Sequence, residues 1–195
     1  MYKRMKKRVT FCAILCILLS LFINSTLANF TSDETTRNVI TSGAVTVEVM
    51  DKQLVGGTLE SYPNEPIAIM PGIKVSKIVS VKNINEPAWV RITYTITIQD
   101  ADGKVIELSA EQRDKLIIIN TDTANWTYKD GWWYCNKALA TGEETKPLFT
   151  QVAFASVEMG NAYQNCSVMI DVTAQAVQKA NNGETIMDAA GWPMN

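Results

Sequence analysis

The sequence of 195 residues contains no histidine. Several catalytic and metal-binding arrangements need an imidazole, so this absence excludes His-containing triads, the HExxH zinc helix and histidine-bearing copper or zinc sites. No nucleophile–base pair stands out among the other side chains. Glu143 and Glu144 lie in a glycine-containing loop, where we expect them to be solvated. We therefore predict no enzymatic activity, no cofactor and no metal site.

Basic side chains are scarce outside the N-terminus. Five of the 18 lysines and arginines fall within the first 28 residues, which hold no acidic side chain. The remainder carries 13 basic against 20 acidic side chains, a formal net charge of −7. An acidic remainder without a basic cluster argues against nucleic acid as a partner. It also argues against docking on an anionic membrane surface.

The longest apolar run lies near the N-terminus, where residues 1–28 have the three parts of a secretory signal peptide. A basic start precedes an apolar core at residues 9–23, and Thr26 and Ala28 place small residues at the −3 and −1 positions. The alternative is a retained membrane anchor, but the core is shorter than a spanning helix and no stop-transfer charges follow it. We predict cleavage between Ala28 and Asn29 by a signal peptidase, secretion of the chain, and no stable membrane insertion afterwards.

Cysteine is also scarce, with four residues in the chain, of which Cys12 and Cys16 would leave with the signal peptide. Cys135 and Cys166 remain. An exported domain meets an oxidising environment, and both residues fall on expected inward faces of strands, so we predict a disulfide between them. Two separate buried thiols are the alternative.

The strongest positive signal is strand alternation, which is clearest from Ala88 to Gln99. Apolar side chains occupy every second position up to Ile98, and mostly polar ones such as Arg91 occupy the others. Further strands are predicted at residues 39–50, 73–84, 104–108, 116–120, 148–156 and 166–177, with one helical turn at 109–114, a mostly irregular stretch at 54–71 and a short C-terminal helix at 184–190.

Eight or nine short strands with turns between them and hardly any helix are typical of an all-β protein. We predict an antiparallel β-sandwich of the jelly-roll or immunoglobulin-like kind over residues 39–195. Residues 29–38, which are polar apart from Phe30, are predicted to form a flexible N-terminal arm.

A hairpin rich in aromatic residues is predicted at residues 125–138, with Asp130-Gly131 as its two-residue turn. That register pairs Tyr128 with Trp133 and Trp126 with Cys135. The cluster could stack on a sugar or form a partner surface, or it could be core plus an amphipathic rim. The candidate surface aromatics are Trp126, Tyr128, Trp132, Trp133 and Tyr134.

Several segments, in order, resemble the TasA/camelysin family of exported proteins of Gram-positive bacteria. They are LANFTSDE at the cleavage point, VITSGAVTVEV, MPGIKVSKIVSVKNINEPAWVRITY, DGWWYCNKALATGEETKPLFTQV, IDVTAQAVQ and AAGWP. The resemblance covers most of residues 20–195. Cys135 and Cys166 depart from it, because the family usually has other residues at those positions. The start of the mature chain is also less aromatic and less acidic than the family's usual start.

The resemblance implies a protein processed by the dedicated signal peptidase SipW and found in the biofilm matrix or at the cell surface. Several members assemble into fibres, which implies that the partner is a second copy of the chain or a related matrix protein. Camelysin is classed as a surface metallopeptidase, but a chain without histidine offers zinc no recognisable site. A monomeric surface module that binds wall glycan or a host ligand is the alternative function.

For assembly, the sequence leads to a hypothesis about the arm that cleavage would free. Sheet edges carry unpaired backbone groups, and an extended segment of one molecule can pair with the edge of the next. We predict that Phe30 and the backbone of the arm, with Val39 and Ile40, donate a strand to a neighbouring subunit. A disordered terminus without a role is the alternative.

Overall fold

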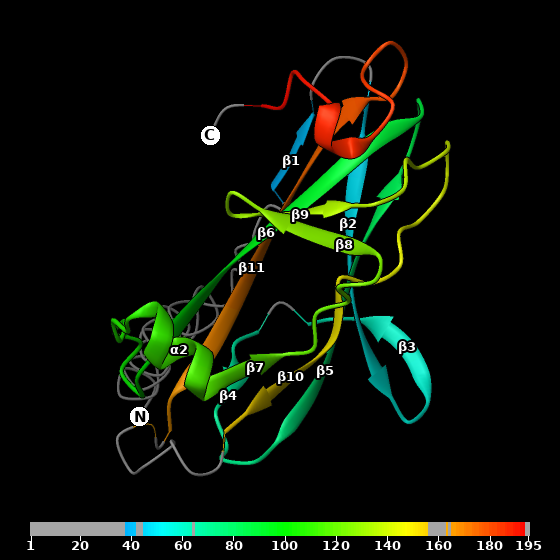
Figure 1. Cartoon of the computed structure of the whole chain (residues 1–195). Helices are drawn as coiled ribbons and strands as arrows, with labels where there is room; N and C mark the ends of the chain where they lie inside the picture. The colour runs from blue at the N-terminus through cyan, green and yellow to red at the C-terminus, as the bar shows by residue number, and fades with distance from the viewer. Residues whose placement is uncertain (1–37, 42–44, 64, 156–162, 164, 194–195) are drawn as a thin grey trace, which may run out of the picture. The chain divides into compact units, whose positions relative to one another are not determined.

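The structure, a computed structural model, describes residues 38–41, 45–63, 65–155, 163 and 165–193 (Figure 1). The predicted signal peptide, the cleavage pair Ala28 and Asn29, and Phe30 with the rest of the arm up to residue 37 lie outside the described residues. The described residues form two β-sheets in which all strand pairs but one are antiparallel. The prediction of an all-β, mostly antiparallel protein is therefore confirmed.

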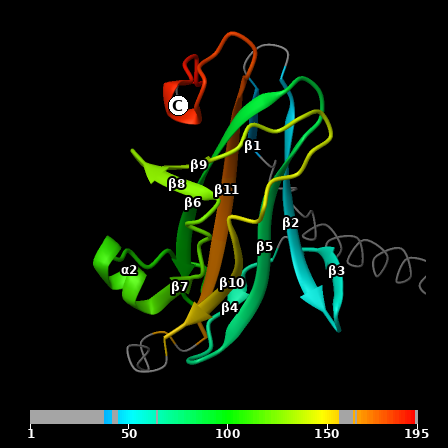
Figure 2. The same cartoon turned by 45° about the vertical axis from the view of Figure 1, so that its right-hand side comes forward.

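The first sheet is built around its two longest strands, which lie side by side in Figure 2. Its order is β1-β11-β6-β9-β8, and the short β4 also pairs with β11. Its strands are β1 (Asn38–Thr41), β4 (Ile67–Ala68), β6 (Ala88–Gln99), β8 (Trp126–Lys129), β9 (Trp132–Cys135) and β11 (Ser167–Gln178).

The second sheet has the order β3-β2-β5-β10-β7. Its strands are β2 (Val47–Val55), β3 (Thr58–Ser61), β5 (Lys74–Asn83), β7 (Ile117–Ile119) and β10 (Phe149–Phe154). Helix α2 (Ala110–Leu116) leads directly into β7, and the 3₁₀ turn η2 (Ile186–Asp188) follows β11.

Strand β6 has the bounds that the sequence predicts, and its apolar side faces the main core. Val90 and Ile92 are fully buried, and so are Val79 and Val81 of β5 in the other sheet. All four belong to one hydrophobic cluster. Residues of both sheets thus contribute to one hydrophobic core, which removes their apolar side chains from water.

Two local predictions are confirmed in detail. Ser109 caps α2: its side chain accepts a hydrogen bond from the Gln112 amide, and the Gln112 side chain accepts one from the Ser109 amide. The β8–β9 hairpin pairs Trp126 with Cys135 and Tyr128 with Trp133, as predicted. Its two-residue turn needs positive φ at both positions, and Asp130 and Gly131 have φ of 48° and 83°.

Other boundaries were predicted wrongly. The strand expected at 39–50 is divided, because β1 ends at Thr41 and β2 begins only at Val47. The stretch expected to be mostly irregular at 54–71 includes the end of β2, β3 and β4, since Gly56-Gly57 closes a tight hairpin rather than opening a loop. The C-terminal helix is only the three-residue turn η2.

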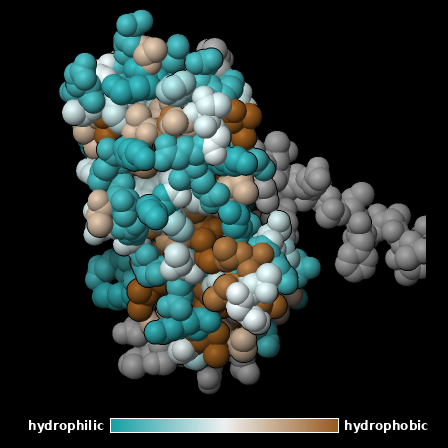
Figure 3. Space-filling view, turned by 90° about the vertical axis from the view of Figure 1, so that its right-hand side faces the viewer, coloured by the Kyte–Doolittle hydropathy of each residue, from teal (hydrophilic) through white to brown (hydrophobic). Residues whose placement is uncertain are grey.

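The β2–β3 hairpin is the most exposed apolar element. All of β3 is exposed, and the cross-strand pair Leu54 and Leu59 has more than half of each side chain in contact with solvent. Figure 3 shows hydrophobic surface gathered in the lower half of one face of the molecule, the end at which this hairpin lies in Figure 1.

Candidate functional site

The edge of β11 that faces away from β6 is the candidate site. On its β6 side, all twelve residues of β11 are paired. On the other side, β4 pairs with Ser167 and Val168, and β1 pairs with residues 173–176. Residues 169–172 lie between these two short partners, and on this side of β11 they pair with no strand among the described residues. Among the described residues, the edge is therefore covered at both ends and open over four residues in the middle.

Strand β1 occupies this edge in parallel orientation, the one parallel pair among the described strands. Val39 lies opposite Ala174, and Ile40 lies opposite Gln175. The two residues predicted to pair with a neighbouring subunit are therefore paired within their own chain. The sheet also begins at Asn38, which the sequence placed at the end of the arm.

A small cavity of about 30 Å³ lies beside the open stretch of β11. Residues 168–171 form one part of its wall, and Asp51, Tyr62 and Lys77 belong to the other part. Lys77 and Asp51 form an ion pair there. Partial burial and the nearby carboxylates of Asp51 and Glu65 together raise the pKa of Tyr62 to about 12, so its hydroxyl stays protonated.

Of the two alternatives that the sequence left open for the aromatic hairpin, the burial of its rings agrees with core plus an amphipathic rim. Trp126 is 1% exposed within the main core, and its Nε1–H donates to the carbonyl oxygen of Lys146 at 3.1 Å. Trp132 and Tyr134 are also buried, in a second cluster with Trp89. Tyr128 remains exposed, and its ring packs against the half-buried Trp133 with centroids 4.9 Å apart. Alternation divides the rings between the two faces of the sheet, so most of them serve packing.

The second cluster surrounds Arg91, a residue that the sequence did not single out. The guanidinium carbon lies 4.2 Å from the ring centroid of Trp132 and 4.6 Å from that of Trp192. Arg91 donates to Oε1 of Gln175 through both Nε and Nη2, at 2.9 and 2.5 Å, and to the Tyr134 hydroxyl at 3.0 Å. The only feature of the sequence that could have indicated this role of Arg91 is its position between apolar residues of β6.

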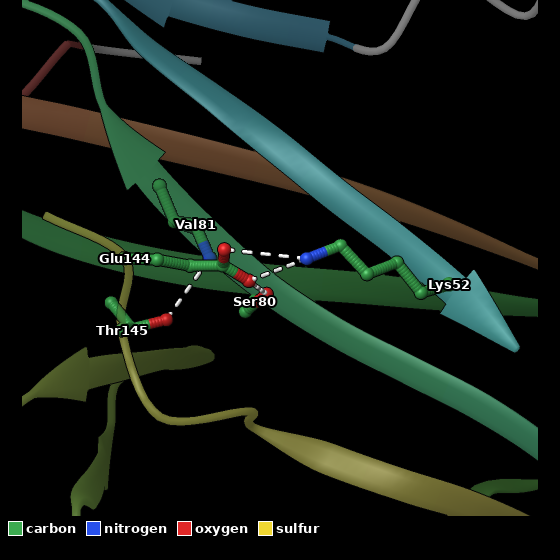
Figure 4. Close-up of polar contacts among 5 residues, drawn as sticks. All are labelled: Lys52, Ser80, Val81, Glu144 and Thr145. Carbon is green, nitrogen blue, oxygen red and sulfur yellow. Dashed lines mark hydrogen bonds and ion pairs between the residues drawn. The ribbon is translucent and has the colours of Figure 1, made fainter. Parts of the chain in front are cut away.

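Glu144 is exposed, as predicted, but its carboxylate is also held by two side chains. Figure 4 shows its carboxylate pointing toward Ser80 and Lys52, from which it accepts hydrogen bonds at 2.5 and 3.0 Å. In the next residue, the Thr145 hydroxyl accepts from the Val81 amide. Partial burial raises the pKa of Glu144, but the Ser80 and Lys52 hydrogen bonds and the lysine charge outweigh it, so that the pKa is lowered overall.

Glu143 is also engaged rather than merely solvated. It pairs with Lys137 and accepts a hydrogen bond from the Ala140 amide. The Lys137 hydrogen bond, followed by the one from Ala140, lowers the pKa of Glu143.

The predicted disulfide is absent, and strand register explains why. Cys135 and Cys166 are both buried thiols. Cys135 follows Tyr134, whose partner on β6 is Arg91, whereas Cys166 precedes Ser167, whose partner on β6 is Gln99. Arg91 and Gln99 are eight residues apart along β6, which corresponds to about 26 Å. A disulfide needs Cα atoms within about 7 Å of each other. Burial raises the pKa of Cys135, which makes its thiol less reactive.

Within the described ranges, no three His, Cys, Asp or Glu side chains come together as a metal-binding group. No helix of the described part of the chain is both long and apolar enough to cross a membrane. A scan against protein-family models, a search of curated proteins and a search of solved structures each find no match to this chain.

Proposed function

We propose that this chain is an exported structural protein of the TasA/camelysin kind, the subunit of an extracellular fibre or cell-surface layer. Its subunits join by donation of an N-terminal strand. The domain is an antiparallel β-sandwich of the jelly-roll or immunoglobulin-like type. Its two sheets and the single main core to which both contribute support this architecture.

The observation that carries the proposal is the pairing of β1 with β11. An N-terminal segment already serves as an edge strand there, so the equivalent segment of a second molecule can make the same parallel backbone contacts in the same register. Exchange of an identical element between copies is a low-cost route to assembly. Because the donor and the acceptor are different surfaces, repetition of the contact extends an open filament unless the rotation closes a ring.

The open stretch of β11 gives a donated strand more to bind than β1 uses. Only residues 173–176 of β11 pair with β1, and residues 169–172 have unpaired backbone groups on this side among the described strands. In the register of β1, residues 34–37 of a longer donor fall opposite them, and Phe30 belongs to the part of the arm that precedes this contact. Backbone hydrogen bonds to these residues would add to the strength of the contact between subunits.

The alternative is a monomeric surface-binding module. Its support is the contact between the exposed Tyr128 and the half-buried Trp133 on the β8–β9 hairpin, whose rings are tilted by 48°. Aromatic rings at a surface can pack against the face of a sugar. This surface is small, since the other three aromatic residues of the hairpin are buried.

Electron microscopy of the mature chain tests the proposal. The chain beginning at Asn29 is expected to form filaments, and a chain beginning at Val39 is expected to fold without forming them. Circular dichroism establishes that the shorter chain is folded. If the shorter chain polymerises as well as the longer one, the arm is not the donor. If neither polymerises and the mature chain binds wall glycan, the surface-module alternative stands.

A further inference from the structure

Lys77 and Asp51 lie on the adjacent strands β5 and β2, in the space between the two sheets. The Lys77 Nζ is 2.6 Å from Oδ2 of Asp51. The side chains are 4% and 20% exposed, whereas the other ion pairs among the described residues are more exposed. Lysine is among the residues that are almost never fully buried. A pair so placed is held close by the strands and has little water around it.

Three further features distinguish this pair from an ordinary ion pair. Oδ1 of Asp51 is buried and has no hydrogen-bond partner among the described residues. The ring of Tyr62 covers Nζ, with 3.9 Å between Nζ and the ring centroid. The cavity of about 30 Å³ is lined by both side chains, and a cavity of this size has room for a water molecule.

We propose that Lys77 and Asp51 become joined by a covalent amide bond between Nζ and Cγ, an isopeptide cross-link within the chain. The lone pair of Nζ forms the new bond to Cγ, and the bond from Cγ to one carboxylate oxygen breaks. Two protons of the lysine ammonium leave with that oxygen as water, and the third stays on the amide nitrogen. Ammonium and carboxylate become amide and water, so the step needs no oxidant, reductant or other reactant.

The surroundings favour this product over the ion pair. Two buried charges carry a desolvation cost, and the neutral amide removes both of them. The protons that Nζ gives up during bond formation have a carboxylate oxygen 2.6 Å away to receive them. Fixed placement of two reacting groups is equivalent to an effective concentration of about 10⁵–10⁸ M. The released water fits the adjoining cavity. The amide N–H of the product faces the Tyr62 ring, which is a weak acceptor.

The cross-link would join neighbouring strands of the second sheet. Asp51 lies opposite Val79 in the ladder, and Lys77 is two residues away from Val79 on β5, so the two side chains are diagonal neighbours on one face. It would tie β2 to β5 independently of hydrogen bonding. This inference does not rest on the proposed function, because a monomeric surface protein could carry the same bond.

Intact-mass measurement of the denatured full chain tests the proposal by comparison of wild type with Asp51→Asn. In wild type the bond releases water, and in the variant the same bond releases ammonia, so both products have the same covalent structure and the same mass. Without the bond, the two masses differ by the ordinary Asp–Asn difference. N-terminal processing cancels in this comparison. Glu144→Gln is the matched control: its carboxylate pairs with a lysine at 3.0 Å near the surface, and its mass is expected to differ by the ordinary Glu–Gln amount.

A tryptic digest of the wild-type chain gives an independent answer that does not depend on whether a variant folds. The expected result is one branched peptide in which residues 38–52 are joined to residues 75–82, because trypsin does not cleave after an acylated Lys77. Lys77→Met is expected to release residues 38–52 as a separate linear peptide. Recovery of residues 38–52 and 75–77 as separate peptides from wild type would overturn the proposal.

Discussion

Arg91 belongs to the polar alternation of β6, yet it is the centre of a second, smaller core. Its guanidinium contacts two tryptophan rings and makes hydrogen bonds to Gln175 and Tyr134. Arginine suits this position because a planar, weakly hydrated cation can stack on rings while it donates in its own plane. One charged side chain therefore organises the outer face of the first sheet and holds the C-terminal segment that contains Trp192.

We predict that Arg91→Lys lowers the free energy of unfolding by about 1–3 kcal/mol, because lysine keeps the charge but loses the paired donation to Gln175 and the stacking. The urea midpoint, followed by tryptophan fluorescence, measures the loss. Arg113→Lys is the control, since Arg113 pairs with Asp114 at the surface and is expected to stay within about 0.5 kcal/mol of wild type. Equal effects of the two substitutions would contradict a special role for Arg91.

The sequence could not have revealed this cluster, because its members come from distant parts of the chain. Arg91, Trp132, Gln175 and Trp192 meet only after β6, β9, β11 and the C-terminal segment are placed. The disulfide prediction failed for the same reason. Alternation along the sequence predicts which face of a sheet a side chain occupies. It does not predict which residues of neighbouring strands lie opposite each other, because that depends on the strand register.

At the scale of elements, three predictions that rest on neighbouring residues are confirmed. The β6 bounds, the Asp130-Gly131 turn and the Ser109 cap all depend on residues within a few positions of one another, and all agree with the structure. The parallel pairing of β1 with β11 has no such signal. More than a hundred residues separate the two strands, and nothing in four residues specifies which edge they will join.

The carboxylate of Glu144 holds the loop between β9 and β10 to Lys52 of β2 and Ser80 of β5. The lowered pKa of Glu144 means that the folded state binds its proton less readily than the unfolded chain, whose value is near 4.5. The resulting stabilisation is fully present above that value and is lost as the pH falls through the lower folded pKa. We predict that the urea midpoint of wild type falls between about pH 5 and pH 3, and that it falls less in Glu144→Gln.

Glu111→Gln provides the control for this measurement, because Glu111 makes only an exposed helix pair with Lys115. Its midpoint is expected to follow the wild-type curve at every pH. If Glu144→Gln also follows the wild-type curve, the contacts of Glu144 with Ser80 and Lys52 do not contribute to acid sensitivity.

At the scale of the whole molecule, β11 connects the first sheet, the sheet's open edge and the cavity. One side of the strand completes the first sheet with β6, and the other side carries β4, the open residues 169–172 and β1. The same strand borders the cavity with the Lys77–Asp51 pair. A strand that pairs with this edge or leaves it therefore changes the solvent exposure of the sheet edge next to the cavity. Assembly and folding of this domain thus depend on the same edge.

A reversible lock on β1 tests strand exchange in the complete mature chain. Asn38 lies opposite Thr173 in the parallel register, and neighbouring strands are about 4.8 Å apart, which is within the Cα range of a disulfide. We predict that the double variant Asn38→Cys, Thr173→Cys stays monomeric when oxidised and forms filaments after reduction. Light scattering and electron microscopy, before and after addition of a thiol, measure the change.

Thr173→Cys alone is the control for this lock. It introduces the same thiol on β11 without a partner on β1, so filaments are expected in both redox conditions. Cys135 and Cys166 are buried and are not expected to exchange with the new cysteines. Filaments from the oxidised double variant would mean that β1 stays in its own sheet during assembly. In that case any donated strand must come from residues 29–37 alone, and its place on β11 would be the open stretch at residues 169–172.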